Sequence, residues 1–209
     1  MKLILILFAF ILTSCSISRQ DPLGRQASKR QQDRMTKSHD CARMKNIPPD
    51  ERAYNYPFIN ARQIQLVSFK SSYDSVWGQY YKDSLPREND TVVYSKLFEI
   101  VTLTKSQIDT LTDIIYNYNN KSNYKAKGNV YFIGTSMNCY NPRNAILFID
   151  NEQKVFEFIE ICFECDKFYT SSDRVSLGID CNQKLELIKT FFQSIGIEYG
   201  ITNSPMKNE

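Results

Sequence analysis

The first fifteen residues differ in kind from the rest of the chain and decide which part of it has to fold. Met1-Lys2 supplies one positive charge, and an unbroken run of ten apolar residues follows from Leu3 to Leu12. A helix that crosses a bilayer needs about 20 such residues, so this run is too short to span one. A charged start followed by a short apolar run is typical of a secretory signal. We therefore expect the folded part of the chain to begin after it.

The apolar run ends in Leu12-Thr13-Ser14-Cys15, which resembles a bacterial lipobox: an aliphatic residue, two small residues and a cysteine. The resemblance implies a diacylglycerol on the Cys15 thiol, cleavage before Cys15 and acylation of the new amino group. Several acyl chains exceed the two signals that stable anchoring needs. We expect residues 1–14 to be a signal peptide and the mature chain to be held on a membrane that it does not cross. An ordinary signal peptide with a chance cysteine is the alternative.

The residue after Cys15 bears on the membrane that is used. In Gram-negative lipoproteins, which this N-terminus resembles, Asp at that position usually implies retention in the inner membrane. Ser16 stands there instead and favours the outer membrane, with the protein facing the periplasm. The chain shows no acidic run after Cys15 of the kind that can direct export to the cell surface. Exposure on the cell surface stays an alternative location.

Residues 15–50 are predicted to be a flexible tether. The stretch from Ser16 to Asp50 holds eight basic and four acidic residues, with few large apolar side chains. Such a segment buries too little apolar surface to offset its chain entropy. We favour a solvated tether, and a basic arm lying on anionic lipid or another polyanion is the alternative. The remaining residues carry 17 basic and 19 acidic side chains, which does not indicate a nucleic-acid partner.

Residues 51–202 are predicted to form one α+β domain, with a mostly antiparallel sheet and two amphipathic helices, followed by a frayed tail over 203–209. A helix is predicted after Thr104, with Gln107 as its capping-box partner, and another over 182–195, ended by Gly196. Apolar and β-branched patterning predicts strands over 63–69, 91–103, 129–134, 145–150 and 154–164. The last of these is apolar on both faces and is expected at the centre of the sheet.

Five cysteines remain besides Cys15, so at least one thiol has no partner within the chain. We expect that thiol to be Cys41, because it lies in the predicted tether. The other four are candidates for structural disulfides, which an exported protein permits, and their pairing stays open; they are Cys139, Cys162, Cys165 and Cys181. A cysteine-only zinc site and a redox-active pair of Cys162 with Cys165 are the alternatives. A zinc ribbon usually shows two C-x2-C knuckles and this chain has one, and no predicted helix follows the pair to lower a thiolate pKa.

Two sequence blocks are distinctive: Cys139-Tyr140-Asn141-Pro142-Arg143 and Ile161-Cys162-Phe163-Glu164-Cys165. Together with the strand and helix over 103–118 and the closing helix after Cys181, they resemble a family of uncharacterised exported bacterial lipoproteins. The resemblance covers roughly residues 60–197. It implies an exported domain with no established activity, and it assigns no catalytic role to any residue.

The sequence offers little catalytic chemistry. Its single histidine, His39, lies in the predicted tether, and it contains no P-loop, dinucleotide fingerprint or HExxH motif. Glu157, Glu160 and Glu164 form an acidic group, but nothing places two of them across a cleft, and ion pairs between strands, with Arg143 as one partner, are the favoured interpretation. We therefore expect a non-enzymatic binding or structural module without metal or cofactor. The alternative function is a thiol-disulfide oxidoreductase or a metal protein that uses Cys162 and Cys165.

Four aromatic residues gather in the loop predicted over 71–90, and they are a candidate contact for an envelope protein or a glycan. Flat aromatic faces can stack on sugar rings or pack on a protein partner, although such a group more often closes over a core. The four are Tyr73, Trp77, Tyr80 and Tyr81.

Four Asp-Ser/Thr-aliphatic triplets resemble the acceptor of some bacterial O-glycosylation systems. Ordinary loop chemistry is the alternative, but four triplets exceed what random placement gives at this composition. Their hydroxyl residues are Ser75, Ser84, Thr91 and Thr110.

The intact mass of the protein extracted from its native membrane tests both modifications. We expect a chain that begins at Cys15, carries acyl groups there and shows added hexose increments. A mass without hexose increments contradicts the glycosylation, and a mass without acyl groups contradicts the anchor. The same protein expressed without export is the control, because it should carry neither addition.

Overall fold

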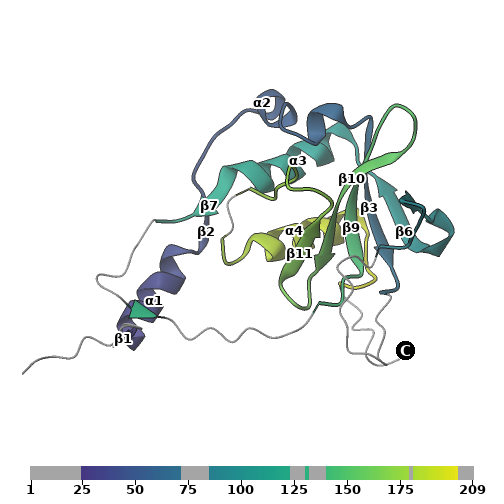
Figure 1. Cartoon of the computed structure of the whole chain (residues 1–209). Coiled ribbons are helices and arrows are strands. Elements are labelled where there is room, and N and C mark those ends of the chain that lie inside the picture. Colours follow the sequence, from purple (N-terminus) through teal and green to yellow (C-terminus); the bar gives the residue numbers. More distant parts are fainter. Residues whose placement is uncertain (1–24, 72–84, 123–129, 132–139, 179–180, 202–209) are drawn as a thin grey trace, which may run out of the picture.

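Five antiparallel strands form the central sheet, in the order β11-β10-β9-β3-β6 (Figure 1). In this computed structural model, residues 25–71, 85–122, 130–131, 140–178 and 181–201 are described. The predicted α+β class with a mostly antiparallel sheet is confirmed. The predicted signal peptide, Cys15 and the tail predicted over 203–209 lie outside the described residues. The strands are β3 (Gln63–Phe69), β6 (Leu97–Thr102), β9 (Asn144–Ile149), β10 (Val155–Cys162) and β11 (Lys167–Thr170).

Both faces of the sheet bury apolar side chains, as expected for strands that are apolar on both sides. All six residues of β9 are buried, and β10 lies between β9 and β11. A tight turn joins β9 to β10, in which the Asp150 carboxylate accepts the amides of Glu152 and Lys154, each at 2.9 Å. A bulge between Val155 and Glu157 shifts the register at the start of β10. The predicted central position of this strand is confirmed.

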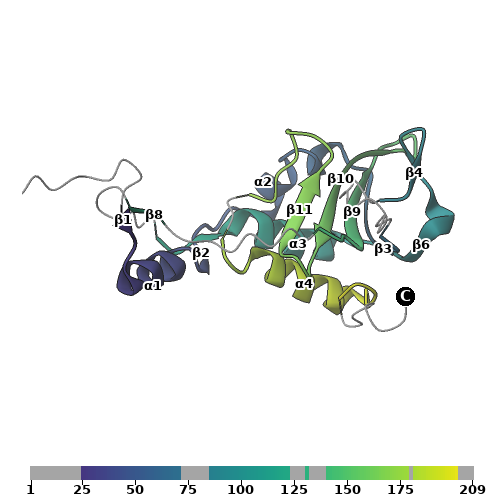
Figure 2. The same cartoon turned by 60° about the horizontal axis from the view of Figure 1, so that its bottom comes forward.

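Two helices cover one face of the sheet: α3 (Lys105–Asn117) and α4 (Lys184–Ile195) (Figure 2). The Thr104 hydroxyl and the Gln107 side chain form the predicted capping box at the start of α3. Gly196 ends α4 with a φ of 96°, a left-handed conformation that glycine adopts without strain. Buried helical residues pack on the inward residues of β3, β9 and β10; the helical set is Leu111, Ile115, Leu185, Ile188, Phe191 and Phe192.

The opposite face is covered by a short hairpin of β4 (Arg87–Glu88) and β5 (Thr91–Val92). Leu85 and Val92 pack there against Val67, Phe69 and Phe158 of the sheet. The single strand predicted over 91–103 is wrong, because the chain forms β5, a turn of 3-10 helix over Tyr94–Lys96 and then β6. The β-branched and aromatic residues that suggested one strand serve two separate elements.

The structure adds an edge strand, β11, to the strands predicted from the sequence. β10 ends at Cys162, a turn over 163–166 follows, and Lys167–Thr170 pairs back on β10 as β11. Asp166 takes a φ of 50° in that turn. Four residues of mixed polarity give too weak an alternation for sequence patterning to separate them from a loop.

An N-terminal arm of residues 25–45 replaces much of the predicted tether, whose extent to Asp50 is therefore wrong. The arm contains β1 (Arg25–Gln26), α1 (Lys29–Ser38) and β2 (Cys41–Arg43). β1 pairs with β8 (Val130–Tyr131), and β2 pairs with β7 (Tyr118–Asn120), which directly follows α3. The arm extends from the end of the molecule opposite β6 in both views (Figures 1 and 2). Ser28 and Gln31 form a capping box that starts α1.

A short helix, α2 (Pro49–Ala53), and a 3-10 turn over Phe58–Asn60 connect the arm to β3. Arg52 of α2 is only 3% exposed, and its guanidinium donates to the Thr112 hydroxyl at 3.2 Å and pairs with the Asp109 carboxylate. Asp113 also pairs with Arg43 of the arm at 3.0 Å. These contacts fix α2 and the arm along α3, because a buried guanidinium needs partners for its donors.

The C-terminal end of α3 is held by a buried lysine from α4. Lys184 is 2% exposed. Its ammonium group donates to the carbonyls of Ile114, Ile115 and Tyr118 at 2.9, 3.0 and 2.7 Å. The last carbonyls of a helix lack partners within the helix and carry its negative dipole end. Lys184 therefore satisfies these acceptors, ties α4 to α3 and fixes the point at which β7 begins.

Replacing this ammonium group tests its contribution to stability. Lys184→Met keeps the aliphatic stem but leaves three carbonyls without their donor, so we expect the free energy of unfolding in urea to fall by about 2–3 kcal/mol. Lys189→Met is the matched control on the same helix, because Lys189 makes only a surface pair with Glu186 at 3.6 Å, and we expect a change within about 0.5 kcal/mol. Equal losses in the two variants would contradict this role.

Candidate functional site

A groove of about 520 Å³ lies where the end of α1 meets β11 and the start of α4. Its residues come from three stretches of the chain: Thr36 to Asp40, Asp166 to Phe168, and Cys181 to Leu185. Ligand sites are concave and combine apolar walls with a few polar groups. The lining residues Leu185 and Cys181 are buried, and Phe168, also in the lining, is 40% exposed.

A disulfide between Cys41 and Cys181 fixes the arm against the start of α4 and forms part of the groove wall. The two cysteines are 140 residues apart in the sequence. Two hydrogen bonds from backbone N–H groups accompany the disulfide. The Asn182 backbone N–H donates to the His39 carbonyl at 2.8 Å, and the Cys41 backbone N–H donates to the Gln183 side-chain oxygen at 2.8 Å. The arm is therefore joined to the residues at the start of α4 by the disulfide and by hydrogen bonds from the residues next to it.

The polar rim of the groove is a hydrogen-bonded set around Asp40. The side-chain amide of Gln183 donates to the Asp40 carboxylate at 3.0 Å. The side-chain amide of Asn182 donates to the Thr36 carbonyl at 2.8 Å and to the Asp40 carboxylate at 3.4 Å. The bond from Gln183 is the main reason that the pKa of Asp40 lies below its usual value; burial opposes it, and the bond from Asn182 and the charges of Lys121 and Lys37 assist it. Asp40 is therefore a carboxylate at neutral pH.

The rim offers acceptors and negative charge. The side-chain amide of Asn182 donates two hydrogen bonds within the protein, and that of Gln183 donates one. Asp40 and Asp166 line the groove, and neither lysine nor arginine is among the described lining residues. A group that brings its own hydrogen-bond donors complements such a rim.

No sequence pattern predicted this groove. His39 and Asp40 precede Cys41, and Asn182 and Gln183 follow Cys181, so the rim residues flank the two ends of one disulfide. Nothing in the sequence alone joins those two cysteines. The signal that was available is the presence of polar residues beside two cysteines, in a chain whose N-terminus predicts export.

The structure changes the assignment of the cysteines. Cys41, expected as the unpaired thiol, is bonded to Cys181, and Cys162 is a free and buried thiol. Cys165 is disulfide-bonded and Cys162 is not, so the alternative of a redox-active pair of Cys162 with Cys165 is not formed, although the strand ends in a turn there. Burial is the main cause that raises the pKa of the Cys162 thiol, and the Glu164 charge raises it further. Hydrogen bonds from the Asn141 and Cys165 backbone and the Arg143 charge lower this pKa but do not outweigh burial. Cys139 lies outside the described residues.

The other expected contact residues divide between described and undescribed parts of the chain. Thr91 is exposed in β5, and Thr110 is exposed on α3, where its hydroxyl donates to the Ser106 carbonyl at 3.1 Å. Both hydroxyls are therefore accessible for modification. The aromatic group and the two serines lie outside the described residues; these are Tyr73, Trp77, Tyr80, Tyr81, Ser75 and Ser84.

The acidic group on and just after β10 is divided among three separate networks. Arg143 is an ion-pair partner, as predicted, and pairs with Glu164 at 2.9 Å, but Arg143 precedes β9 and Glu164 lies in the turn after β10, so the pair does not join two strands. Glu160 is fully buried and accepts the Leu85 amide at 2.6 Å and the Tyr140 hydroxyl at 3.0 Å. These bonds fix the segments before β4 and β9 on the sheet, which is a structural role.

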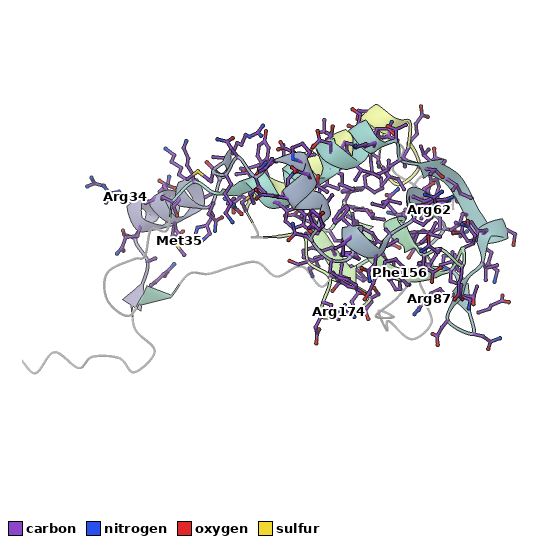
Figure 3. The ribbon with its side chains drawn as sticks, turned by 90° about the horizontal axis from the view of Figure 1, so that it is seen from above. Arg34, Met35, Arg62, Arg87, Phe156 and Arg174 are labelled. Carbon is purple, nitrogen blue, oxygen red and sulfur yellow. A yellow bond between two sulfur atoms is a disulfide. The ribbon has the colours of Figure 1, made fainter. Side chains whose placement is uncertain are left out.

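Glu157 is the centre of the third network. Its carboxylate accepts the hydroxyls of Tyr56 at 2.5 Å, Ser172 at 2.7 Å and Ser171. Burial opposes ionisation of Glu157, but these three hydroxyl donors and the nearby Arg174 charge together hold its pKa below the usual value. Burial and the bond to Glu157 raise the pKa of Tyr56 to about 12, and the Arg174 guanidinium stacks 3.9 Å from the Tyr56 ring centre. Figure 3 shows Arg174 at the rim of the molecule, on the side where Phe156 also lies.

Comparison of the chain with protein-family models, with curated proteins and with solved structures finds no match. Within the described residues, no helix is both long and apolar enough to cross a bilayer. The described residues also contain no group of three or more histidine, cysteine or acidic side chains placed to hold a metal ion. The groove is thus assigned from its own geometry.

Acid titration tests the Glu157 network. Because the pKa of Glu157 is lowered by folding, its ionised form stabilises the fold above the ordinary glutamate range, and that contribution is lost as the pH falls towards the lowered pKa. We expect Glu157→Gln to lower the free energy of unfolding by about 1–2 kcal/mol at pH 7 and by less at pH 3. Glu152→Gln, which replaces an exposed carboxylate in a turn, should have little effect at either pH. A Glu157→Gln deficit that stays constant with pH would contradict the assignment.

Proposed function

We propose that the protein is a lipid-anchored cell-envelope binding module, and that the groove between the arm, β11 and α4 is its binding site. The anchor is acylated Cys15, and the favoured location is the outer membrane, facing the periplasm. The observation that carries the proposal is the groove itself, whose wall is locked by a disulfide and whose rim is an ordered set of polar groups. A preorganised rim lowers the entropy that a ligand must overcome on binding.

The chemistry of the rim selects the class of ligand. Carboxylates at Asp40 and Asp166 and an exposed Phe168 ring suit a cationic group with several hydrogen-bond donors. A guanidinium or primary ammonium group meets both requirements, and it is available as a side chain of an envelope protein or as a polyamine. Neutral glycans bring hydroxyl donors without charge and are the competing ligand for the same site.

The thiol-disulfide alternative gains no support from the described geometry. A redox centre needs an accessible thiol that ionises readily, whereas Cys162 is 1% exposed and its pKa is raised by burial. Cys165 is already disulfide-bonded. The binding function is therefore the one that we propose.

Titration of the purified protein with agmatine, which carries a guanidinium and an ammonium group, tests the site by calorimetry. We expect Asp40→Asn to weaken agmatine binding about tenfold, since a charge-assisted hydrogen bond is lost. Phe168→Ala should weaken it several-fold through loss of the ring face. Asp173→Asn is the matched control, because Asp173 is an exposed carboxylate outside the groove, and it should bind as the parent does.

Equal agmatine affinity in the parent and in Asp40→Asn would contradict the groove as a cation site. Binding of a neutral disaccharide, weakened by Phe168→Ala and unaffected by salt, would keep the groove as the binding site and replace the class of ligand. No agmatine and no disaccharide binding would contradict the proposed binding function.

A further inference from the structure

Helix α1 separates its basic side chains from the side chains that face the protein. Lys29, Arg30, Arg34 and Lys37 are exposed, and at 100° per residue they share one side of the helix with Asp33. The opposite side is formed by partly or fully buried residues, which are Gln31, Gln32, Met35, Ser38 and His39. Figure 3 shows Arg34 pointing outward at the end of the molecule, away from the sheet. A tether would present these charges in no fixed pattern, whereas the helix presents them as one surface.

The charge of the whole chain is divided in the same way. The arm, residues 25–45, holds seven basic and two acidic side chains, while residues 46–209 hold 17 basic and 20 acidic. A net charge of +5 is thus concentrated in 21 residues, beside a remainder of −3. An anionic surface attracts the arm and repels the rest of the chain, so this asymmetry orients the molecule as well as attracting it.

The arm also lies close in sequence to the proposed anchor. Fourteen residues lead from Cys15 to Lys29, so even a fully extended chain cannot carry the start of α1 more than about 50 Å from Cys15. An anchor at Cys15 therefore holds the helix within reach of the headgroups. Polybasic segments beside a lipid anchor bind anionic lipid for this reason.

We propose that the basic face of α1 docks on the anionic headgroups of the membrane that holds Cys15. This inference rests on the proposed lipid anchor. The arm is then a second attachment that directs the negatively charged sheet domain, with the groove at its junction with the arm, away from the bilayer. The disulfide between Cys41 and Cys181 makes the orientation of α1 also the orientation of the domain, because it links the arm to α4.

Hydrogen exchange of the full chain, purified with its acyl groups and reconstituted into vesicles, tests the docking. Vesicles of phosphatidylcholine alone are compared with vesicles that also contain phosphatidylglycerol. We expect the amides of Lys29–Ser38 to exchange at least fivefold more slowly on the anionic vesicles, because the docked helix frays less often. The amides of α4 should exchange equally on both, and the difference should disappear at high salt, which screens the attraction.

A variant with Lys29, Arg30, Arg34 and Lys37 all changed to Gln removes the basic face and keeps good helix-forming residues. It should lose the difference between the two kinds of vesicle. The matched control changes four exposed basic residues of the domain, Arg62, Lys96, Lys105 and Lys154, to Gln and should keep it. The salt dependence of the unaltered protein decides the question even if the first variant does not keep α1 folded.

The outcomes separate the docking from the anchor. Equal exchange of α1 on the two kinds of vesicle, in an acylated chain that floats with them, overturns the docking alone. Loss of the difference in both variants also overturns it, since the attraction would then not belong to α1. A chain without acyl mass that does not float overturns the anchor and this inference with it.

Discussion

The buried ammonium group of Lys184 fixes the relation between the two helices on which the rest of the fold depends. It satisfies carbonyls at the end of α3 and at the start of β7 while being itself the first residue of α4. β7 in turn pairs with β2 of the arm. The position of the arm therefore follows from where α3 stops, and that point is fixed by a single charge buried against a helix end. Gly178 supports the same junction, because a side chain there would collide with the Ile115 carbonyl.

The four residues from Cys181 to Lys184 belong both to the contact between α3 and α4 and to the segment that forms the proposed binding groove. Cys181 is bonded to Cys41, Asn182 and Gln183 donate to the rim carboxylate of Asp40, and Lys184 holds α3. Structure and proposed function thus share one short segment. Cys181 lines the groove and also forms the disulfide to the arm, and the lining residue Gln183 directly precedes Lys184, which holds α3. The contacts that hold these segments together therefore also hold the groove in shape.

Local patterns predicted the elements whose signal lies within one stretch of chain. The capping box of Thr104 and Gln107 and the glycine that ends α4 both follow from neighbouring residues, and both are present. The predictions failed where the deciding partner is distant. The arm had too few apolar residues to be predicted as folded, and it is held by strand pairing, a disulfide and the Asn182 and Gln183 side chains, 140 residues or so away. β11 is four residues long and is a strand because β10 lies beside it.

The sequence by itself determined the α+β class, the two amphipathic helices and the apolar strands, because hydrophobic period and capping chemistry are local. It also supplied the short apolar run and Cys15, on which the proposed signal peptide and lipid anchor rest. Only the tertiary structure decided that Cys41 pairs with Cys181, that Cys162 is free and buried and that His39 and Asp40 line a groove. Those facts depend on which distant segments meet, and segments meet through packing and buried charge, which leave no periodic mark in the chain.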